Sequence, residues 1–181
     1  FNPGTRSKKS KKEENNHNGF SDTWTFINPL KAFFTISYKE VSRGKRGMFS
    51  ALSYYLKHAS ERDAMSNLSF FPSRMLMSRG SLGMSAEVQV SLSPDRELQF
   101  SWNPRSAASP YHNDDQVLLV AYNVEARAAV TAIGPAFRRD GSASLSLGDL
   151  PAGVVHVYLG FVSYDRSKAA DSVYLGEVEV G

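Results

Sequence analysis

Residues 154–164 read VVHVYLGFVSY, and residues 172–180 read SVYLGEVEV. The motif Val-Tyr-Leu-Gly therefore occurs twice, at 157–160 and at 173–176, in segments rich in the β-branched and aromatic residues that favour strands. Because a short polar stretch separates the two segments, we expect them to be neighbouring antiparallel strands of one sheet. The glycine of each motif predicts a β-bulge or a close backbone approach, and the apolar phase, which slips after Gly176, favours a bulge there.

Upstream of these strands, from Ala86 onward, apolar and polar residues alternate with a period of two. Residues 116–123 are apolar at nearly every position, which is typical of a central strand that is buried on both faces. Regular turn signals between short strands are typical of a β-sandwich. Residues 86–181 are thus predicted to form a seven-stranded antiparallel β-sandwich. The expected strands are 88–92, 98–102, 116–123, 128–133, 145–147, 154–164 and 172–180.

The part of the chain before the sandwich has helical periodicity. Asn28-Pro29 combines a helix N-cap residue with proline at the first helical position, and apolar side chains follow at helical spacing. Gly44 is placed to end this helix as a left-handed C-cap residue. A second amphipathic stripe covers residues 48–59. The sequence therefore predicts an α+β fold in which residues 20–85 form a helical hairpin, followed by a linker (66–77) that is irregular and then extended.

The N-terminal segment is strongly basic, although the whole chain has a net charge of only +3. From Glu13 onward, 16 basic residues stand against 18 acidic ones. Residues 1–19 are expected to form an extended arm without a core of its own. Three roles stay open for it: a solvated arm, a contact with an acidic neighbour, and a contact with nucleic acid or anionic lipid. The basic residues of the arm are Arg6, Lys8, Lys9, Lys11 and Lys12.

Several kinds of chemistry have no support in the sequence. The chain has no cysteine, which excludes disulfides, thiol catalysis and cysteine–zinc sites. No run of 18 apolar residues predicts a transmembrane helix. Residues 113–115 (Asn-Asp-Asp) fit either a calcium ligand set on a loop or an ordinary polar loop. The spacings in 44–47 and 80–83 match neither a phosphate-binding loop nor a nucleophile elbow. We therefore expect no enzymatic activity, no metal and no cofactor.

Two segments of the predicted sandwich have a recognisable pattern. Residues 98–102 read LQFSW, and residues 147–153 form a turn before a long strand. The first resembles the second strand of fibronectin type III domains, with its buried tryptophan, and the second resembles the turn before the sixth strand of that fold. The resemblance implies a fibronectin type III-like or immunoglobulin-like sandwich.

Six further segments, distributed over the helical part and the sandwich, carry a second resemblance. They are residues 28–31, 54–57, 77–82, 119–123, 158–163 and 171–176. With these segments the chain resembles a Bacteroidota family known only as a domain of unknown function. The resemblance implies a bacterial origin and a helical N-terminal part followed by a sandwich, and it implies no activity.

Aromatic residues are the remaining candidates for a binding surface, with eight Tyr, eleven Phe and two Trp in the chain. Trp24, Tyr111, Tyr122 and Tyr164 are candidates for a surface on which sugars stack, and packing in the core is the alternative.

Two functions fit these observations. We favour a non-enzymatic assembly subunit that associates with itself through the N-terminal arm, as a filament or surface assembly. The alternative is a cell-surface module that binds a glycan or a protein. We disfavour binding to nucleic acid and favour an extracellular or cell-surface location.

Overall fold

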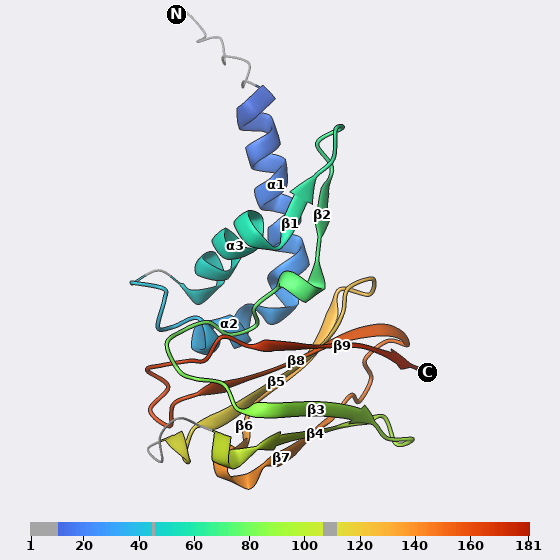
Figure 1. The fold of residues 1–181 in the computed structure, drawn as a ribbon. Coiled ribbons are helices and arrows are strands. Elements are labelled where there is room, and N and C mark those ends of the chain that lie inside the picture. Colours follow the sequence, from blue (N-terminus) through green and yellow to red (C-terminus); the bar gives the residue numbers. More distant parts are fainter. Residues whose placement is uncertain (1–10, 45, 107–111) are drawn as a thin grey trace, which may run out of the picture.

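The structure is a computed structural model that describes residues 11–44, 46–106 and 112–181. It has three layers: helices, a four-stranded sheet and a three-stranded sheet (Figure 1). The helices cover the outer face of the four-stranded sheet, and the three-stranded sheet packs on its other face. The predicted α+β class, with a sandwich of seven strands, is confirmed.

The two sheets are antiparallel throughout. Strand order is β3–β4–β7 in one sheet and β6–β5–β8–β9 in the other. β6 is longer than predicted, because it continues past Gly134, which has φ 72°. The strands are β3 (Ala86–Leu92), β4 (Glu97–Asn103), β5 (Gln116–Asn123), β6 (Ala128–Phe137), β7 (Ser142–Ser146), β8 (Gly153–Val162) and β9 (Val173–Val180).

The repeated Val-Tyr-Leu-Gly segments are neighbouring strands, β8 and β9, as predicted. Tyr158 pairs with Tyr174 and Val157 pairs with Gly176, so Leu175 is the extra residue of a bulge. Gly176 has φ 98°, a conformation that favours glycine. The bulge resets the phase of β9, so that apolar residues on both sides of it pack into the core between the sheets.

The central strand β5 is apolar on both faces because it separates two cores. Val117, Leu119 and Ala121 face the core between the sheets. Leu118 and Tyr122 alternate with them and face the core beneath the helices.

The N-terminal arm is not extended over its whole length, which corrects the prediction for residues 1–19. Helix α1 spans Lys11–Ile27, and its outer end projects away from the body (Figure 1). Thr23 and Ile27, one turn apart, are fully buried and anchor the helix. Upstream, Lys-Lys-Glu-Glu at 11–14 are good helix formers, so the helix continues outward from this anchor.

The predicted helical hairpin is a three-helix arrangement. After α1, a single 3-10 turn η1 (Asn28–Leu30) with Pro29 leads into the short helix α2 (Lys31–Ser37). α2 ends at Ser37, well before Gly44, where Tyr38 leaves the helical conformation (φ −113°, ψ 9°). The Tyr38 side chain is buried and donates its hydroxyl to the Leu76 carbonyl (2.7 Å).

Helix α3 (Gly47–His58) agrees closely with the predicted second helix. It begins at a glycine because a Cβ at Gly47 would lie 1.9 Å from the Phe34 carbonyl oxygen of α2. The two helices therefore pack in direct contact.

A small hairpin after α3 was not predicted. β1 (Ser60–Arg62) pairs with β2 (Leu68–Phe70), and the 3-10 turn η2 (Pro72–Arg74) follows. The linker then runs extended with Met75 and Met77 buried, as their alternation predicts. Two further 3-10 turns, η3 (Pro104–Ser106) and η5 (Arg138–Asp140), lie in the sandwich loops.

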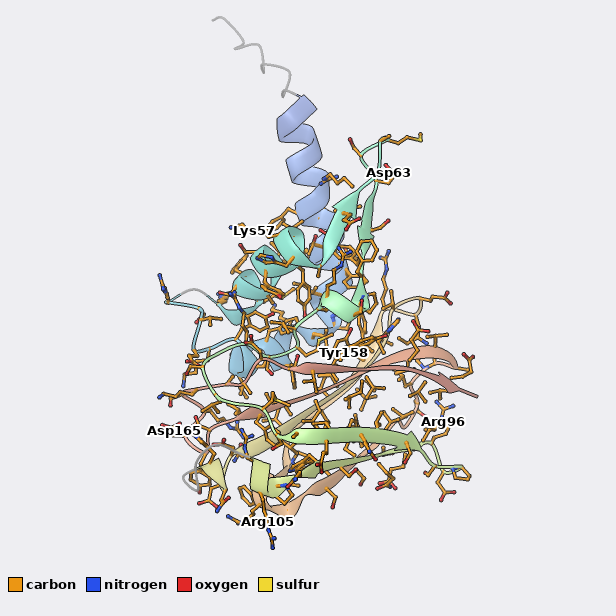
Figure 2. The ribbon with its side chains drawn as sticks, viewed as in Figure 1. Lys57, Asp63, Arg96, Arg105, Tyr158 and Asp165 are labelled. Atoms are coloured by element: carbon orange, nitrogen blue, oxygen red, sulfur yellow. The ribbon has the colours of Figure 1, made fainter. Side chains whose placement is uncertain are left out.

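Buried tyrosines connect the sandwich to the helical part. Tyr158 of β8 donates to the Pro72 carbonyl (2.8 Å), and Tyr122 of β5 donates to the Phe26 carbonyl. Figure 2 shows Tyr158 on the four-stranded sheet beneath the helices. Because these hydroxyls satisfy backbone carbonyls across the layer boundary, the helices and the sandwich form one packed unit.

Candidate functional site

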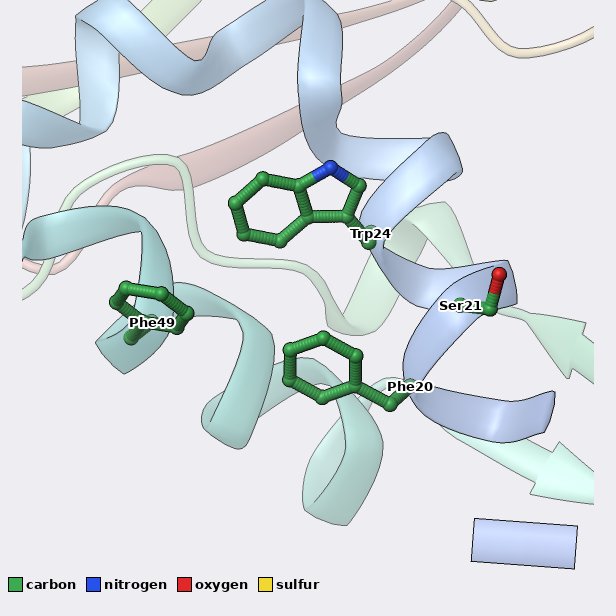
Figure 3. A pocket seen from close by; sticks show the side chains of 4 residues that line it. All are labelled: Phe20, Ser21, Trp24 and Phe49. Carbon is green, nitrogen blue, oxygen red and sulfur yellow. The ribbon is translucent and has the colours of Figure 1, made fainter. Parts of the chain in front are cut away.

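An exposed aromatic cluster lies between α1 and α3 (Figure 3). Phe20 and Trp24 are four residues apart on α1 and stack with ring centroids 6.1 Å apart. Phe49 of α3 lies 5.7 Å from Trp24. With Ser21, these rings line a hollow of about 370 Å³. Phe20 and Phe49 stay 43% and 39% exposed, so the cluster is an apolar surface and not core.

A second hollow, of about 350 Å³, continues from Phe49 along α3. The Tyr54 ring lies there between His58 (4.7 Å) and the Arg79 guanidinium (4.8 Å). Burial raises the pKa of Tyr54, and the charge of Arg79 opposes that rise. The aromatic surface thus passes into a basic one.

A third hollow, of about 630 Å³, lies between α2, the start of α3 and the turn between β8 and β9. Ile36 and Met48 give it an apolar floor. Four cations surround it, all on exposed residues, and we call it the cationic hollow. These cations are Lys31, Lys39, Arg46 and Arg166.

The end of the sandwich away from the cationic hollow and the β8–β9 turn is acidic. Arg96 of the β3–β4 turn donates to the carbonyls of Leu150 and Gly181, so the β3–β4 turn, the β7–β8 loop and the end of β9 meet there. The β5–β6 turn joins them through Asn123, which donates to the Pro151 carbonyl (3.1 Å). Arg127 of the β5–β6 turn is an exposed cation there, but four exposed carboxylates outnumber it and define this acidic end. They are Asp95, Glu125, Asp149 and Glu179.

The two halves of the chain carry opposite charge. Residues 1–85 contain 14 basic and 6 acidic residues, whereas residues 86–181 contain 7 basic and 12 acidic ones. Positive charge is therefore not confined to the arm, because residues 20–85 alone have 9 basic and 4 acidic residues. The molecule is electrically polarised between the helical part and the sandwich.

Of the predicted arm residues, Arg6, Lys8 and Lys9 lie outside the described residues. Lys11 and Lys12 lie in the first turn of α1, at its projecting end.

The four predicted aromatic residues do not form one surface. Trp24 is half-buried in the cluster with Phe20 and Phe49. Tyr122 is fully buried beneath the helices, where its ring contacts Phe26 edge-on, so it belongs to the core. Tyr164 is 68% exposed in the β8–β9 turn, away from Trp24. Tyr111 lies outside the described residues.

The two adjacent aspartates do not form a calcium site. Asp115 is buried and pairs with Arg138 (2.9 Å), and Asp114 pairs with Arg139. Arginine thus neutralises both carboxylates. In the described ranges, no group of three or more His, Cys, Asp or Glu side chains is arranged to hold a metal ion. No helix in these ranges is long and apolar enough to cross a membrane.

A family model, described as a family of unknown function (DUF6266), matches residues 3–176. The chain belongs to this family. The DUF6266 match covers both the helical part and the sandwich. A search of curated proteins gave no match.

Two solved structures with fibronectin type III domains are similar to this DUF6266 member. The crystal structure of chicken CNTN1 domains FN1–FN3 has a TM-score of 0.42 at 12% identity, over 56% of this chain. The chain spans only 33% of that structure. The solution structure of the fn3 domain of human contactin 1 has a TM-score of 0.36 at 16% identity, over 57% of this chain and 87% of the other.

Trp24 was predicted from the sequence as a candidate binding residue, but its ring partners Phe20 and Phe49 were not. The i, i+4 spacing of Phe20 and Trp24 was a usable signal once residues 11–27 are read as helix. Phe49 has no such signal, because only the packing of α3 on α1 brings it to the cluster.

Proposed function

We propose that the protein is a non-enzymatic assembly subunit, in which the basic N-terminal half of one copy binds the acidic sandwich of the next. The observation that carries the proposal is the opposite charge of the two halves, 14 basic against 6 acidic residues in one and 7 against 12 in the other. Such a contact joins different surfaces of the two copies, and if the rotation does not close a ring it continues into a filament. Complementary charge steers this encounter and fixes its orientation.

The projecting helix α1 supports a role for the basic arm. Its first turn carries two of the arm cations, Lys11 and Lys12, at the end that projects away from the body (Figure 1). The proposal includes an extracellular or cell-surface location for the assembly.

Light scattering over a concentration series tests this function. At low salt we expect the mass to grow with concentration, and at about 0.5 M salt we expect it to fall toward the monomer, because salt screens charges that lie near the surface. Replacing the five arm cations with Gln is expected to weaken association roughly 10- to 100-fold, at a few tenths of a kcal/mol for each exposed pair.

A matched control replaces five exposed cations outside the arm with Gln, and we expect it to weaken association less. The control residues are Lys57, Arg62, Arg74, Arg105 and Lys168. A protein that stays monomeric at every concentration at low salt would contradict the proposed function.

The aromatic cluster favours a second candidate function, a module that binds a glycan or another protein. Exposed rings next to a basic surface are typical of interaction sites. Titration with a glycan panel, followed by tryptophan fluorescence, tests it. Trp24 is half-exposed and Trp102 is buried, so a response that is lost in Trp24→Phe and kept in Trp102→Phe supports binding at the cluster.

A further inference from the structure

The cationic hollow has a surplus of positive charge that its own chain compensates only in part. After the hydrogen bonds from Ser163 and Ser167, the Lys39 charge also lowers the pKa of Asp165 in the β8–β9 turn, so one carboxylate faces the four cations. Within the described ranges, none of Lys31, Lys39 and Arg46 forms an ion pair with a carboxylate, and Arg166 contacts only the neutral Gln116 amide oxygen (3.3 Å). Like charges around one hollow repel each other and create a positive potential, which an anionic partner relieves. The hollow therefore attracts anionic groups of other molecules.

The start of α3 adds to this potential. Gly47 lines the hollow as the first residue of a 12-residue helix. The first turn has no acidic residue, and no side chain caps it. The Phe49 N–H donates to the Arg46 carbonyl (2.9 Å), and the partial positive charge of the helix start at Gly47 adds to that of the four cations.

The acidic end of the sandwich has complementary chemistry. Among the described residues, Asp95, Glu125, Asp149 and Glu179 form no ion pair. The neighbouring Arg96 is engaged with backbone carbonyls and so leaves these carboxylates uncompensated. The three connections that carry Asp95, Glu125 and Asp149 meet at one end of the sandwich, where their exposed carboxylates are accessible to another molecule.

The two surfaces cannot meet within one molecule. Arg166, at the rim of the hollow, follows Asp165 in the β8–β9 turn, and Arg96 marks the acidic end. Figure 2 shows Asp165 and Arg96 at opposite ends of the sandwich. Each surface must therefore find its complement on another molecule.

We propose that the acidic end of one copy docks into the cationic hollow of the next copy. This inference rests on the proposed assembly function and names its interface. The contact repeats along the direction of the strands, because each copy presents the hollow at one end and the carboxylates at the other.

Charge reversal with rescue tests the interface by sedimentation velocity. One variant reverses the hollow (Lys31→Glu, Lys39→Glu and Arg46→Glu), and a second variant reverses the acidic end (Asp95→Lys, Glu125→Lys and Asp149→Lys). We expect each variant alone to associate at least ~100-fold more weakly than the native chain, because like charges then face each other. An equal mixture regains association, since every reversed surface meets an opposite one.

A control with the same change in net charge reverses three exposed cations away from the hollow, Lys57→Glu, Arg74→Glu and Arg105→Glu, and is expected to weaken association far less than the hollow reversal does. Rescue by mixing also shows that both variants are folded. If the native chain associates and the hollow-reversed variant associates equally well, this interface is wrong while the assembly function stands. A native chain that is monomeric throughout overturns both.

Discussion

Arg138 is a buried arginine that connects three segments of the sandwich. It is 1% exposed, and its guanidinium lies 2.9 Å from Asp115 and 2.9 Å from the Gly83 carbonyl. It also stacks 3.9 Å above the Phe161 ring. Burial lowers the pKa of Arg138, and the Asp115 carboxylate opposes that change. The side chain thus fastens the linker before β3 to the four-stranded sheet.

Replacing Arg138 with Met is expected to lower the free energy of unfolding by about 3–5 kcal/mol, because it leaves the Asp115 carboxylate buried without its partner. Urea denaturation measures this change. The neighbouring Arg139→Gln is the control. Arg139 pairs with Asp114 at the surface, and we expect a cost below ~1 kcal/mol. Equal costs for the two variants would contradict the structural role of Arg138.

Buried tyrosines make stability sensitive to alkaline pH. Burial raises the pKa of Tyr38, Tyr55, Tyr122 and Tyr158. Below pH ~10 these four tyrosines are neutral in the folded and in the unfolded chain, so they contribute fully to the free energy of unfolding. Above it the unfolded chain ionises and the folded chain does not, so stability falls as the pH rises.

The free energy of unfolding is therefore expected to fall by about 1.4 kcal/mol per pH unit for each buried tyrosine above pH ~10. Denaturation with urea at a series of alkaline pH values measures the slope. In Tyr158→Phe the fall in the free energy of unfolding with pH should be smaller by the contribution of one tyrosine, about 1.4 kcal/mol per pH unit. At neutral pH the same variant should be less stable by ~1–2 kcal/mol, because the Pro72 carbonyl loses its donor. An unchanged slope in that variant would show that Tyr158 ionises in the folded protein.

Strand β8 and the extended linker lie so close together that position 160 of β8 requires glycine. A Cβ at Gly160 would lie 2.2 Å from the Ser78 hydroxyl, which itself donates to the Ala170 carbonyl (2.7 Å). Gly160→Ala is expected to cost about 1–3 kcal/mol in thermal or urea unfolding, since the linker must shift. Gly83→Ala is the matched control, because a Cβ there meets nothing within 4 Å, and it should change stability by less than ~0.5 kcal/mol. A neutral Gly160→Ala would mean that the linker is not held against β8.

Elements whose sequence pattern lies within a few neighbouring residues could be predicted, and elements that depend on distant contacts could not. The sandwich and its bulge could be predicted because their patterns involve neighbouring residues only. These patterns are the apolar residues on both faces of β5 and the change of apolar phase at Gly176. Helix α1 was missed because its outer half is polar, and its inner anchor, Thr23 and Ile27, is recognisable only against the rest of the core. The β1–β2 hairpin has short strands with few buried residues, so it has no clear periodicity.

The candidate sites follow the same rule. Basic residues of the arm and Trp24 were identified from composition and residue type. The cationic hollow joins Lys31 of α2 to Arg166 of the β8–β9 turn, more than a hundred residues apart, and only the fold brings them together. Tyr122 was misassigned because an aromatic residue in a strand looks alike on either face, whereas its position in β5 turns it toward the helices.

In the proposed assembly, whole molecules join through surfaces of opposite charge at their opposite ends. This arrangement explains why a protein with a net charge of only +3 keeps its positive and negative residues apart. It also requires that the same two surfaces meet in every contact along an assembly.

Zero-length cross-linking of amines to carboxylates, in a mixture of isotopically heavy and light copies, identifies the surfaces through which the copies join. The expected result is mixed-isotope cross-links from Lys31 and Lys39 to Asp95, Glu125 or Asp149, which disappear in high salt. Cross-links that join only residues of the same copy, or that join copies through surfaces other than the basic arm, the cationic hollow and the acidic end, would contradict this arrangement.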